Sequence, residues 1–376
     1  MKPTLALTLC LTRDCQLNCD YCYTGPKTKK SMPLETALLA VDLGIHELLG
    51  IVREKPLLPK TLQLGFFGGE PLMEWNTLRK TTEYCEKQTE KHGIFFAPTL
   101  TTNALLLDAE KAEYLKEKNF HVGLSIDGDA ESHDALRRFP NASGSHDIAS
   151  KALQFFQNDD AEYAETIFVI DPRNLRGAAQ GTKWLLEQGA RKIALNPNFT
   201  TKWTPDDLDT WKTQYEKIAE IYIDYIRELI PVEINFIDNK IKTHVEEGYK
   251  DCDKCGFGVA EIAVAPSGNI YPCERIVADD SNTDLEIGNV SKGLNHTKIN
   301  AISAERKKIP RKCQNCHLKT RCAHWCACVN YQTTGTLNEI DDTLCFHEKM
   351  TISIADNTAE TLAKENNPLF IARFYG

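Results

Sequence analysis

Strand-like and helix-like segments alternate six times over roughly the first 200 residues, and this alternation restricts the fold more than any other feature of the chain. The expected strands are short apolar runs such as 61–67. The expected helices are longer segments with apolar residues at helical spacing, such as 33–50. The pattern predicts a parallel sheet with crossover helices, whose ligands bind at the carboxyl ends of the strands. We therefore expect an α/β fold with a partial (β/α)6 barrel over residues 1–230.

Charge and hydropathy limit the partners and the compartment. The 376 residues carry a formal net charge of −9 and only short basic stretches, so we expect no binding of nucleic acid. No apolar run approaches the ~20 residues of a membrane span, and Arg13 and Asp14 end the first apolar stretch early. We expect a cytoplasmic protein without membrane contact. In that reducing compartment, cysteines at short spacings bind metals more often than they form disulfides.

Three of the 14 cysteines lie close together, directly after the first expected strand. Cys15, Cys19 and Cys22 form the pattern C-x3-C-x2-C, with no histidine nearby to complete a catalytic zinc site. Each iron of a [4Fe–4S] cluster takes one thiolate, so three thiolates would leave one iron open for a small molecule. The alternative is a structural zinc loop that a distant residue completes.

This loop, with Tyr21 before its last cysteine, resembles the radical S-adenosylmethionine (SAM) superfamily. The resemblance implies a TIM-like partial barrel and a [4Fe–4S] cluster whose open iron binds the amino and carboxylate groups of SAM. It also implies cleavage of SAM to a 5′-deoxyadenosyl radical, which abstracts a substrate hydrogen. In such enzymes the cofactor performs the difficult chemistry and the protein positions it.

Further motifs of the same superfamily follow in the expected order. "FFGGEPL" resembles the GGEP motif, "TLTTNALLL" resembles a T-N-G segment with Ala104 in place of glycine, and "GLSIDGDAESHDALRR" resembles an S-x-D-G…H-D-x-x-R stretch. The resemblance assigns an ammonium group to a glutamate, the ribose to a serine and an aspartate, the methionine carboxylate to an arginine and the adenine to a leucine. The implied SAM contacts are Tyr21, Gly68, Gly69, Glu70, Thr102, Asn103, Ser125, Asp127, Arg137 and Leu195. Ordinary turn and core roles are the alternatives for Asp127 and Leu195.

A second group of cysteines occupies residues 252–345 and resembles the SPASM extension, the auxiliary-cluster domain of radical enzymes that modify peptides and proteins. The resemblance implies a metal-stapled domain over residues 231–350, followed by a tail, 351–376, with a short helix and an apolar end. It also implies two fully ligated [4Fe–4S] clusters, three in all with the first loop. One auxiliary cluster would take Cys252, Cys255, Cys273 and Cys326, and the other Cys313, Cys316, Cys322 and Cys345. A pair of four-thiolate zinc sites is the alternative.

The remaining thiols and one carboxylate complete the candidate site. Cys10 and Cys85 are expected to be core thiols, whereas Cys328 lies close enough in sequence to replace a ligand. Glu274 follows Cys273 directly, where anaerobic sulfatase-maturing enzymes carry an aspartate that is the proposed general base. We expect Glu274 to be catalytic, with a surface salt bridge as the alternative.

The resemblance implies a radical SAM/SPASM maturase that modifies a ribosomally synthesised peptide, forming a thioether, a carbon–carbon crosslink or a similar product. The partners would be a peptide or protein substrate and a reductant such as flavodoxin or ferredoxin. The first expected strand begins at about residue 5, which leaves no room for an N-terminal leader-binding domain, so a separate leader-binding protein is a further expected partner. The rivals are formylglycine formation in a sulfatase, a small-molecule substrate, and a non-catalytic electron-transfer or zinc-binding module.

Overall fold

The computed structural model describes residues 4–52, 60–157, 162–251 and 253–376, and the chain divides into two compact units. Each unit is built from segments that are far apart in the sequence. The first unit comprises Met1–Asn18, Cys22–Gly123 and Cys255–Lys307. The second unit comprises Cys19–Tyr21, Leu124–Lys254 and Lys308–Gly376.

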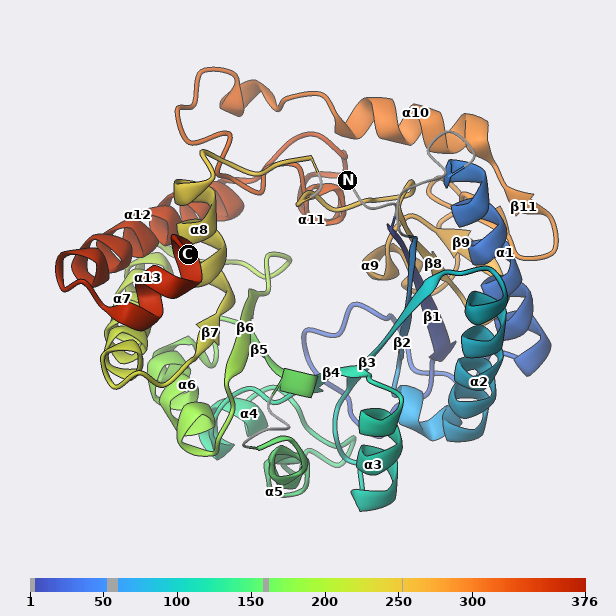
Figure 1. The fold of residues 1–376 in the computed structure, drawn as a ribbon, viewed down its shortest axis with the longest axis horizontal. Coiled ribbons are helices and arrows are strands. Elements are labelled where there is room, and N and C mark those ends of the chain that lie inside the picture. Colours follow the sequence, from blue (N-terminus) through green and yellow to red (C-terminus); the bar gives the residue numbers. More distant parts are fainter. Residues whose placement is uncertain (1–3, 53–59, 158–161, 252) are drawn as a thin grey trace. The chain divides into compact units, whose positions relative to one another are not determined.

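The first unit contains a mixed sheet with the strand order β11-β10-β9-β8-β1-β2-β3 (Figure 1). Its strands are β1 (Thr4–Thr12), β2 (Thr61–Gly68), β3 (Phe95–Thr102), β8 (Glu261–Val264), β9 (Asn269–Tyr271), β10 (Gly288–Asn289) and β11 (Gly293–Leu294). Strands β1, β2, β3 and β8 are parallel, and the register pairs Leu7 of β1 with Leu64 of β2 and with Ile262 of β8. Strands β8 and β9 form an antiparallel hairpin, as the "PSGN" turn predicts.

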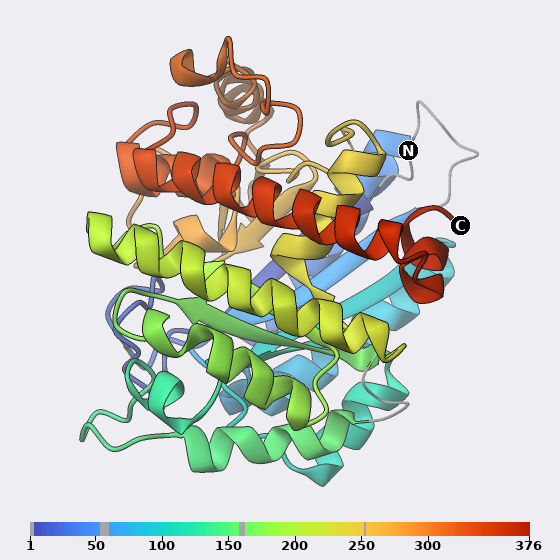
Figure 2. The same ribbon diagram turned by 90° about the vertical axis from the view of Figure 1, so that its left-hand side faces the viewer.

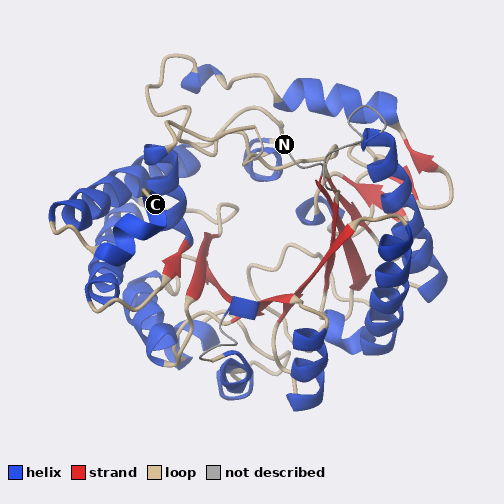
Figure 3. Cartoon of the chain, in the orientation of Figure 1, coloured by secondary structure: helices blue, strands red, loops and turns tan. Residues whose placement is uncertain are grey.

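Helices α1 and α2 pack beside each other against β1, β2 and β3 (Figures 1 and 3). Alternate residues of β1, such as Leu5, Leu7 and Leu9, are almost fully buried, which accounts for the apolar character of this strand. The helices of the first unit are α1 (Leu34–Val52), η1 (Pro71–Glu74), α2 (Trp75–Lys91), α3 (Ala109–Glu117), α9 (Glu274–Val277) and α10 (His296–Arg306). The short strand β4 (His121–Ser125) contains the point at which the first unit gives way to the second.

The second unit contains the parallel strands β5, β6 and β7 and most of the long helices. The strands are β5 (Ala164–Ile170), β6 (Lys192–Pro197) and β7 (Glu233–Ile234). The helices are α4 (Ala130–Asp134), α5 (His146–Ala149), η2 (Ser150–Phe156), η4 (Leu175–Gly177), α6 (Ala178–Glu187), α7 (Pro205–Arg227), α8 (Asn235–Val245), η5 (Arg311–Cys313), α11 (Ala327–Thr334), α12 (Asp342–Lys364) and α13 (Pro368–Phe374). Figure 2 shows α7 and α12 side by side, and α12 also packs on α8.

Helix capping explains where the two longest helices of this unit begin. Thr204 and Asp207 form a reciprocal capping box at the start of α7, as the threonine and the acidic first turn predict. The Asp341 side chain accepts hydrogen bonds from the backbone N–H groups of Thr343 and Leu344, which starts α12 at Asp342. The expected short helix of the tail is therefore the second half of a 23-residue helix, and the apolar end forms α13.

The structure confirms the mixed α/β fold with a parallel sheet and a cysteine-rich C-terminal region. Among the described residues, no helix has the length and apolar character that crossing a bilayer requires. The domain boundaries at residues 230 and 350 stay a prediction.

Candidate functional site

The first cysteine loop supplies Cys15 and Cys22 to the first unit, and each sulfur atom has nitrogen donors around it. The backbone N–H of Leu17 lies 3.4 Å from the Cys15 Sγ, and the Asn103 amide nitrogen lies 3.5 Å from it. The Lys27 ammonium lies 2.9 Å from the Cys22 Sγ, and the Thr24 hydroxyl lies 3.1 Å from the same sulfur. Donors directed at sulfur stabilise a thiolate ligand, so this environment fits an iron–sulfur cluster.

The two thiols differ in acidity because their donors differ in charge. Burial raises the pKa of Cys15, and its neutral N–H donors do not offset this effect. Burial also opposes ionisation of Cys22, but the Lys27 ammonium and the Thr24 hydroxyl lower the pKa of Cys22 below its ordinary value. Lys27 is therefore a contributor to this loop that the sequence reading missed, although its position five residues after Cys22 was a usable signal.

The two glycines of the GGEP motif allow β2 to approach the start of the cysteine loop. Gly68 has φ = +127°, and a Cβ atom there would lie 2.4 Å from the Thr12 carbonyl oxygen. A Cβ atom on Gly69 would lie 2.0 Å from the Asp14 carbonyl oxygen. Backbone hydrogen bonds from Gly69 N to Thr12 O and from Glu70 N to Asp14 O, at 2.7 and 2.9 Å, fix this contact. Side chains other than hydrogen would force the two segments apart.

Glu70 is fully buried and joins the end of β2 to the end of β3. Its carboxylate accepts hydrogen bonds from Leu72 N at 2.9 Å, Thr102 Oγ1 at 2.7 Å and Asn103 N at 2.7 Å. Burial raises the pKa of Glu70 to about 7, even though these three donors oppose the shift. The observed partners of the carboxylate are thus chain atoms, and its contact with an ammonium group stays a prediction.

Ala104 stands where the resembling motif has glycine, and it adopts a left-handed conformation with φ = 67°. This conformation costs an L-residue about 1–2 kcal/mol relative to the right-handed region. The Ala104 N–H donates to Thr102 Oγ1 at 3.1 Å, and the Thr102 hydroxyl in turn donates to Glu70. The backbone turn that glycine would favour is therefore kept by the alanine, and Asn103 is held next to Cys15.

In the second unit, Asp127 gathers two of the other expected SAM contacts. The Tyr21 hydroxyl donates to Asp127 Oδ2 at 2.6 Å, and Arg137 Nε lies 2.9 Å from the same oxygen. The Arg137 guanidinium also lies over the Tyr21 ring, 5.2 Å from its centroid. Asp127 is fully buried and accepts a further hydrogen bond from Val169 N at 2.8 Å, which joins this group to β5. Roles of Asp127 and Arg137 at the ribose and carboxylate stay predictions.

Two further expected cofactor contacts, Ser125 and Leu195, are also buried. Ser125, at the end of β4, is 8% exposed, and Leu195, on β6, is 1% exposed. The Leu195 backbone N–H donates to Asn235 Oδ1 at 3.0 Å, which ties β6 to the start of α8. Leu195 is therefore packed as a core residue, and its contact with adenine stays a prediction.

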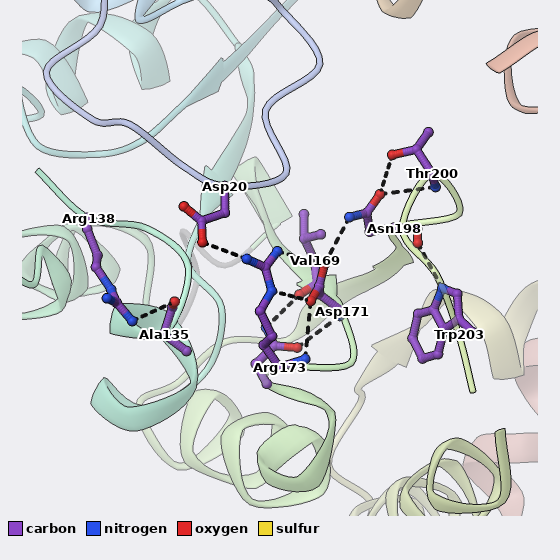
Figure 4. Close-up of polar contacts among 10 residues, drawn as sticks. Asp20, Ala135, Arg138, Val169, Asp171, Arg173, Asn198, Thr200 and Trp203 are labelled. Carbon is purple, nitrogen blue, oxygen red and sulfur yellow. Dashed lines mark hydrogen bonds and ion pairs between the residues drawn. The ribbon is translucent and has the colours of Figure 1, made fainter. Parts of the chain in front are cut away.

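A polar network at the carboxyl ends of β5 and β6 was not foreseen from the sequence (Figure 4). Arg173 pairs with the fully buried Asp171 at 2.8 Å and with Asp20 at 2.6 Å, and the Asn198 side chain donates to Asp171 at 2.9 Å. Asp20 lies between Cys19 and Tyr21 in the cysteine loop. Arg173 therefore links this short loop segment to β5. An aspartate and an arginine directly after a strand were a signal that the sequence reading left unused.

The β8–β9 hairpin brings Cys255, Glu261, Cys273 and Glu274 together in the first unit. A Glu261 oxygen, the Cys273 Sγ and a Glu274 oxygen lie within 4.8 Å of one another. The Cys255 Sγ is 2.8 Å from Glu261 Oε2, and Arg306 donates to the Cys255 carbonyl at 2.8 Å. Burial and the neighbouring Glu274 charge raise the pKa of Glu261. The sequence reading expected Cys255, Cys273 and Glu274 here and missed Glu261.

The cysteines of the second expected cluster are neighbours in the second unit. Burial raises the pKa of Cys313, and nearby charges on Cys345 and Cys316 raise it further. Burial and the Glu348 charge raise the pKa of Cys322, and Cys313 adds a smaller effect in the same direction. The Sγ atoms of Cys326 and Cys328 lie 3.7 Å apart, so Cys328 is placed beside an expected ligand. Cys252 lies outside the described residues.

A buried ion pair supports this second cysteine group. Lys240 Nζ lies 2.7 Å from Glu348 Oε2, and both residues are 4% exposed. Glu348 also accepts a hydrogen bond from Ala323 N at 2.6 Å, directly after Cys322. Lys240 donates to the Arg321 carbonyl at 3.1 Å, so the pair holds both sides of Cys322. Outside these groups, Cys10 and Cys85 are buried and burial raises the pKa of each, which confirms them as core thiols.

Comparison with known proteins matches residues 9–158 to the radical SAM superfamily. The chain is 31% identical over 190 residues to an uncharacterised protein of Methanocaldococcus jannaschii, an alignment that covers 50% of this chain and 61% of that protein. It is 23% identical to the cysteine-type anaerobic sulfatase-maturating enzyme of Clostridium novyi, with 87% and 88% of the two chains covered. It is also 23% identical to the radical SAM cyclopropyl synthase TigE of Paramaledivibacter caminithermalis, with 92% and 73% covered.

Solved structures show the same fold. Native anSMEcpe with bound AdoMet and the Cp18Cys peptide matches with a TM-score of 0.76 at 20% identity, covering 96% of this chain and 99% of that one. Streptococcus suis SuiB bound to its precursor peptide SuiA matches with a TM-score of 0.59 at 17% identity, covering 92% and 76%. The match of residues 9–158 to the radical SAM superfamily supports SAM and iron–sulfur as cofactors. Residues 9–158 thus match the radical SAM superfamily, in a chain whose sequence relatives include an anaerobic sulfatase-maturating enzyme and a radical SAM cyclopropyl synthase.

Proposed function

We propose that the chain is a radical SAM maturase that modifies a ribosomally synthesised peptide and carries three [4Fe–4S] clusters. One observation carries the proposal: the radical SAM domain is followed in the same chain by a second field of thiols, part of which surrounds Glu261 on the β8–β9 hairpin. Bound SAM and a reduced cluster would supply the radical that abstracts a substrate hydrogen. The product is a thioether, a carbon–carbon crosslink or a similar oxidised group, and the electron donor is flavodoxin or ferredoxin.

In this proposal the loop cysteines Cys15, Cys19 and Cys22 hold the SAM-binding cluster, and their surroundings position SAM. Lys27 and Asn103 direct N–H groups at two of the sulfur atoms. Tyr21 and Arg137 are oriented by Asp127, which limits their movement. One auxiliary cluster takes Cys252, Cys255, Cys273 and Cys326, and the other takes Cys313, Cys316, Cys322 and Cys345.

Glu274 is the proposed general base. Its carboxylate lies 3.4 Å from the Cys273 Sγ at the start of α9, so a proton released from an oxidised substrate would be accepted beside an electron acceptor. The placement of a carboxylate next to a thiol of the auxiliary site is what supports this role. Replacement of Glu274 by glutamine should remove product formation while SAM cleavage continues.

Anaerobic reconstitution tests the proposal directly. Wild type should hold about twelve irons, and the variant with Cys15, Cys19 and Cys22 changed to alanine should hold about eight. Dithionite and SAM should yield 5′-deoxyadenosine with wild type and none with the variant. Zinc in place of iron, or an iron-loaded wild type that does not cleave SAM, would contradict the proposal.

Formylglycine formation in a sulfatase is the second candidate, because the alignment to the Clostridium novyi enzyme spans most of both chains. The Cp18Cys peptide, which is bound in the structure of anSMEcpe, is the probe. Conversion of its cysteine to formylglycine, detected by mass spectrometry, would favour this candidate over peptide crosslinking. If SAM is cleaved but the peptide stays unchanged, the result would favour a different substrate.

A further inference from the structure

One residue of the "GLSIDGDAESHDALRR" stretch, His133, has no role in the proposed function, although it lies between the expected SAM contacts Asp127 and Arg137 in the sequence. His133 is on the short helix α4 in the second unit, and its side chain is fully buried. Both of its imidazole nitrogens have hydrogen-bond partners. A buried imidazole bonded at both nitrogens is held in one orientation and one tautomer. These partners therefore decide what His133 can do.

The two partners fix the position of the proton on the imidazole ring. Asp127 N lies 3.1 Å from His133 Nδ1, and a backbone N–H can only donate, so Nδ1 accepts and carries no proton. The proton of the neutral ring is then on Nε2, which lies 3.0 Å from Ser145 Oγ. Ser145 in turn donates to the Arg137 carbonyl oxygen at 2.7 Å. Hydrogen bonds thus run in one direction from the Asp127 N–H, through His133 and Ser145, to the Arg137 carbonyl.

The surroundings of His133 keep its ring neutral, as this chain of hydrogen bonds requires. Burial lowers the pKa of His133 well below its ordinary value, and the charge of Arg137 and the neighbouring His146 lower it further. A second proton would have to bind at Nδ1, where it would face the Asp127 N–H and break the first hydrogen bond. His133 is therefore a fixed, neutral bridge.

The next residue of the same stretch, Asp134, holds Ser145 in place. Asp134 Oδ1 accepts hydrogen bonds from Ser145 N at 2.8 Å and from His146 N at 3.0 Å. Gly144 allows this approach, because a Cβ atom there would overlap with the Asp134 carboxylate. Ser145 itself is 1% exposed, so water does not compete for its hydroxyl. Both ends of the bridge are thus fixed by the fold.

We propose that His133 is a positioning residue for SAM, which sets the spacing between Asp127 and Arg137 through Ser145. The inference rests on the proposed function, because it takes Asp127 and Arg137 as SAM contacts. Arg137 N also donates to the His133 carbonyl at 2.9 Å, so the backbone and the side chain of His133 act on the same neighbour. Loss of the imidazole leaves the buried Asp127 N–H without an acceptor and frees the two SAM contacts to move apart.

The test compares His133→Leu with His146→Leu in the full chain after anaerobic reconstitution. His146 is the matched control, because it is also buried and its ring centre lies 5.6 Å from that of His133. Among the described residues, neither nitrogen of His146 has a hydrogen-bond partner, so this ring takes no part in the chain of bonds. Equilibrium dialysis gives the Kd for SAM, and 5′-deoxyadenosine formation with dithionite gives KM and kcat.

His133→Leu should raise the Kd and the KM for SAM about tenfold, because the contacts with SAM lose their fixed spacing. The kcat at saturating SAM should change less than about twofold. His146→Leu should leave the Kd and the KM as in wild type. His133→Asn should recover part of the loss, since its side-chain oxygen takes the place of Nδ1 and accepts from Asp127 N. Ser145→Ala, which removes the link to the Arg137 carbonyl, should also weaken SAM binding and leaves His133 itself unchanged.

Nuclear magnetic resonance of the chain labelled with 15N-histidine reads the tautomer directly, and His133 should carry its proton on Nε2. The inference is overturned if His133→Leu and His146→Leu bind SAM equally well, if Ser145→Ala binds it like wild type, or if the proton is on Nδ1. A wild type that neither binds nor cleaves SAM would overturn the proposed function and the inference with it. Normal SAM cleavage that is insensitive to these changes would overturn the inference alone.

Discussion

Two buried glutamates, one in each unit, have pKa values shifted in opposite directions because their hydrogen-bond partners differ in charge. Within the described residues, Glu70 accepts its hydrogen bonds from neutral groups, and burial raises its pKa to about 7. Glu348 is equally hidden from water, but the Lys240 ammonium outweighs that burial and lowers its pKa to about 2. The same contrast separates Cys15, with neutral donors, from Cys22, with Lys27. Burial sets the cost of a charge, and the charge of the partner decides whether the group carries one.

Removal of the Lys240 ammonium tests whether this cation stabilises the buried Glu348 carboxylate. Lys240→Met leaves a buried carboxylate without a counter-charge and should lower the free energy of unfolding by about 3–5 kcal/mol. Denaturant titration followed by circular dichroism measures the change. The double variant Lys240→Met, Glu348→Gln should recover part of the loss, because glutamine is neutral and still accepts from Ala323 N.

The matched control is Lys364→Met on α12. Lys364 Nζ lies 2.7 Å from Glu360 Oε1, and both side chains of this pair are exposed. This change should leave the unfolding midpoint where it is, since exposed pairs contribute little. An equal loss of unfolding free energy in Lys240→Met and Lys364→Met would contradict the conclusion that burial makes the Lys240–Glu348 pair important for stability.

The raised pKa of Glu70 predicts that the free energy of unfolding falls as the pH rises, which is opposite in sign to the effect of a carboxyl with a lowered pKa. A carboxyl whose pKa rises from 4.5 to about 7 on folding adds stability below pH 4.5, and this contribution is lost as the pH rises toward 7. The loss amounts to up to about 3 kcal/mol. Glu348, with its lowered pKa, adds no slope in that range. Unfolding midpoints of wild type and Glu70→Gln between pH 5 and 7.5 should therefore diverge as the pH rises, with wild type losing stability relative to the variant, and parallel curves would refute the assignment.

Lys27→Met sharpens the comparison of the two thiols. Loss of the ammonium should raise the pKa of Cys22, so that less thiolate is present at neutral pH and iodoacetamide reacts more slowly at this position. Mass spectrometry of the metal-free protein gives the labelling rate at each cysteine. Cys316, which lies outside this loop, serves as the internal reference and should react at an unchanged rate. An unaltered Cys22 rate would show that Lys27 does not control its acidity.

The smallest effect is expected at Ala104, beside the Glu70 group. Ala104→Gly relieves about 1–2 kcal/mol of left-handed strain, but it removes a buried methyl group worth about 0.8 kcal/mol and frees the unfolded chain. The net change in unfolding free energy should stay below about 1 kcal/mol. Ala104→Val should cost more, because a β-branched residue is poorly tolerated at positive φ. A loss above 2 kcal/mol for the glycine variant would be incompatible with this balance.

Local sequence patterns predicted the elements whose residues are consecutive. The alternation along β1, β2 and β3, the capping box of α7 and the "PSGN" hairpin are all encoded within a few residues. Apolar residues at helical spacing predict one helix over residues 146–158, and its described part is instead the four-residue α5 followed by the 3₁₀ helix η2. Tertiary packing decides such marginal helices, and composition does not reveal it.

The parts of the candidate site that lie within sequence motifs could be predicted, whereas contacts between residues far apart in the sequence could not. The cysteine spacings and the GGEP turn identified the candidate loops, although the hydrogen-bond partners of Glu70 could not be read from the motif. Lys240 and Glu348 are 108 residues apart, so no local pattern marks their contact. Glu261 was missed for a different reason: its register opposite Cys273 emerges only once the hairpin pairing is known.

The pairing of β1 with β8 has a consequence for synthesis of the chain. One edge of β1 is completed by residues 261–264, which leave the ribosome long after residues 4–12. At about 5–20 residues per second, that edge waits for tens of seconds with its backbone N–H and C=O groups unpaired. The first strand must therefore be shielded from other nascent chains before the last third of the protein exists. Contact order, as much as cluster assembly, should set the rate at which active molecules accumulate.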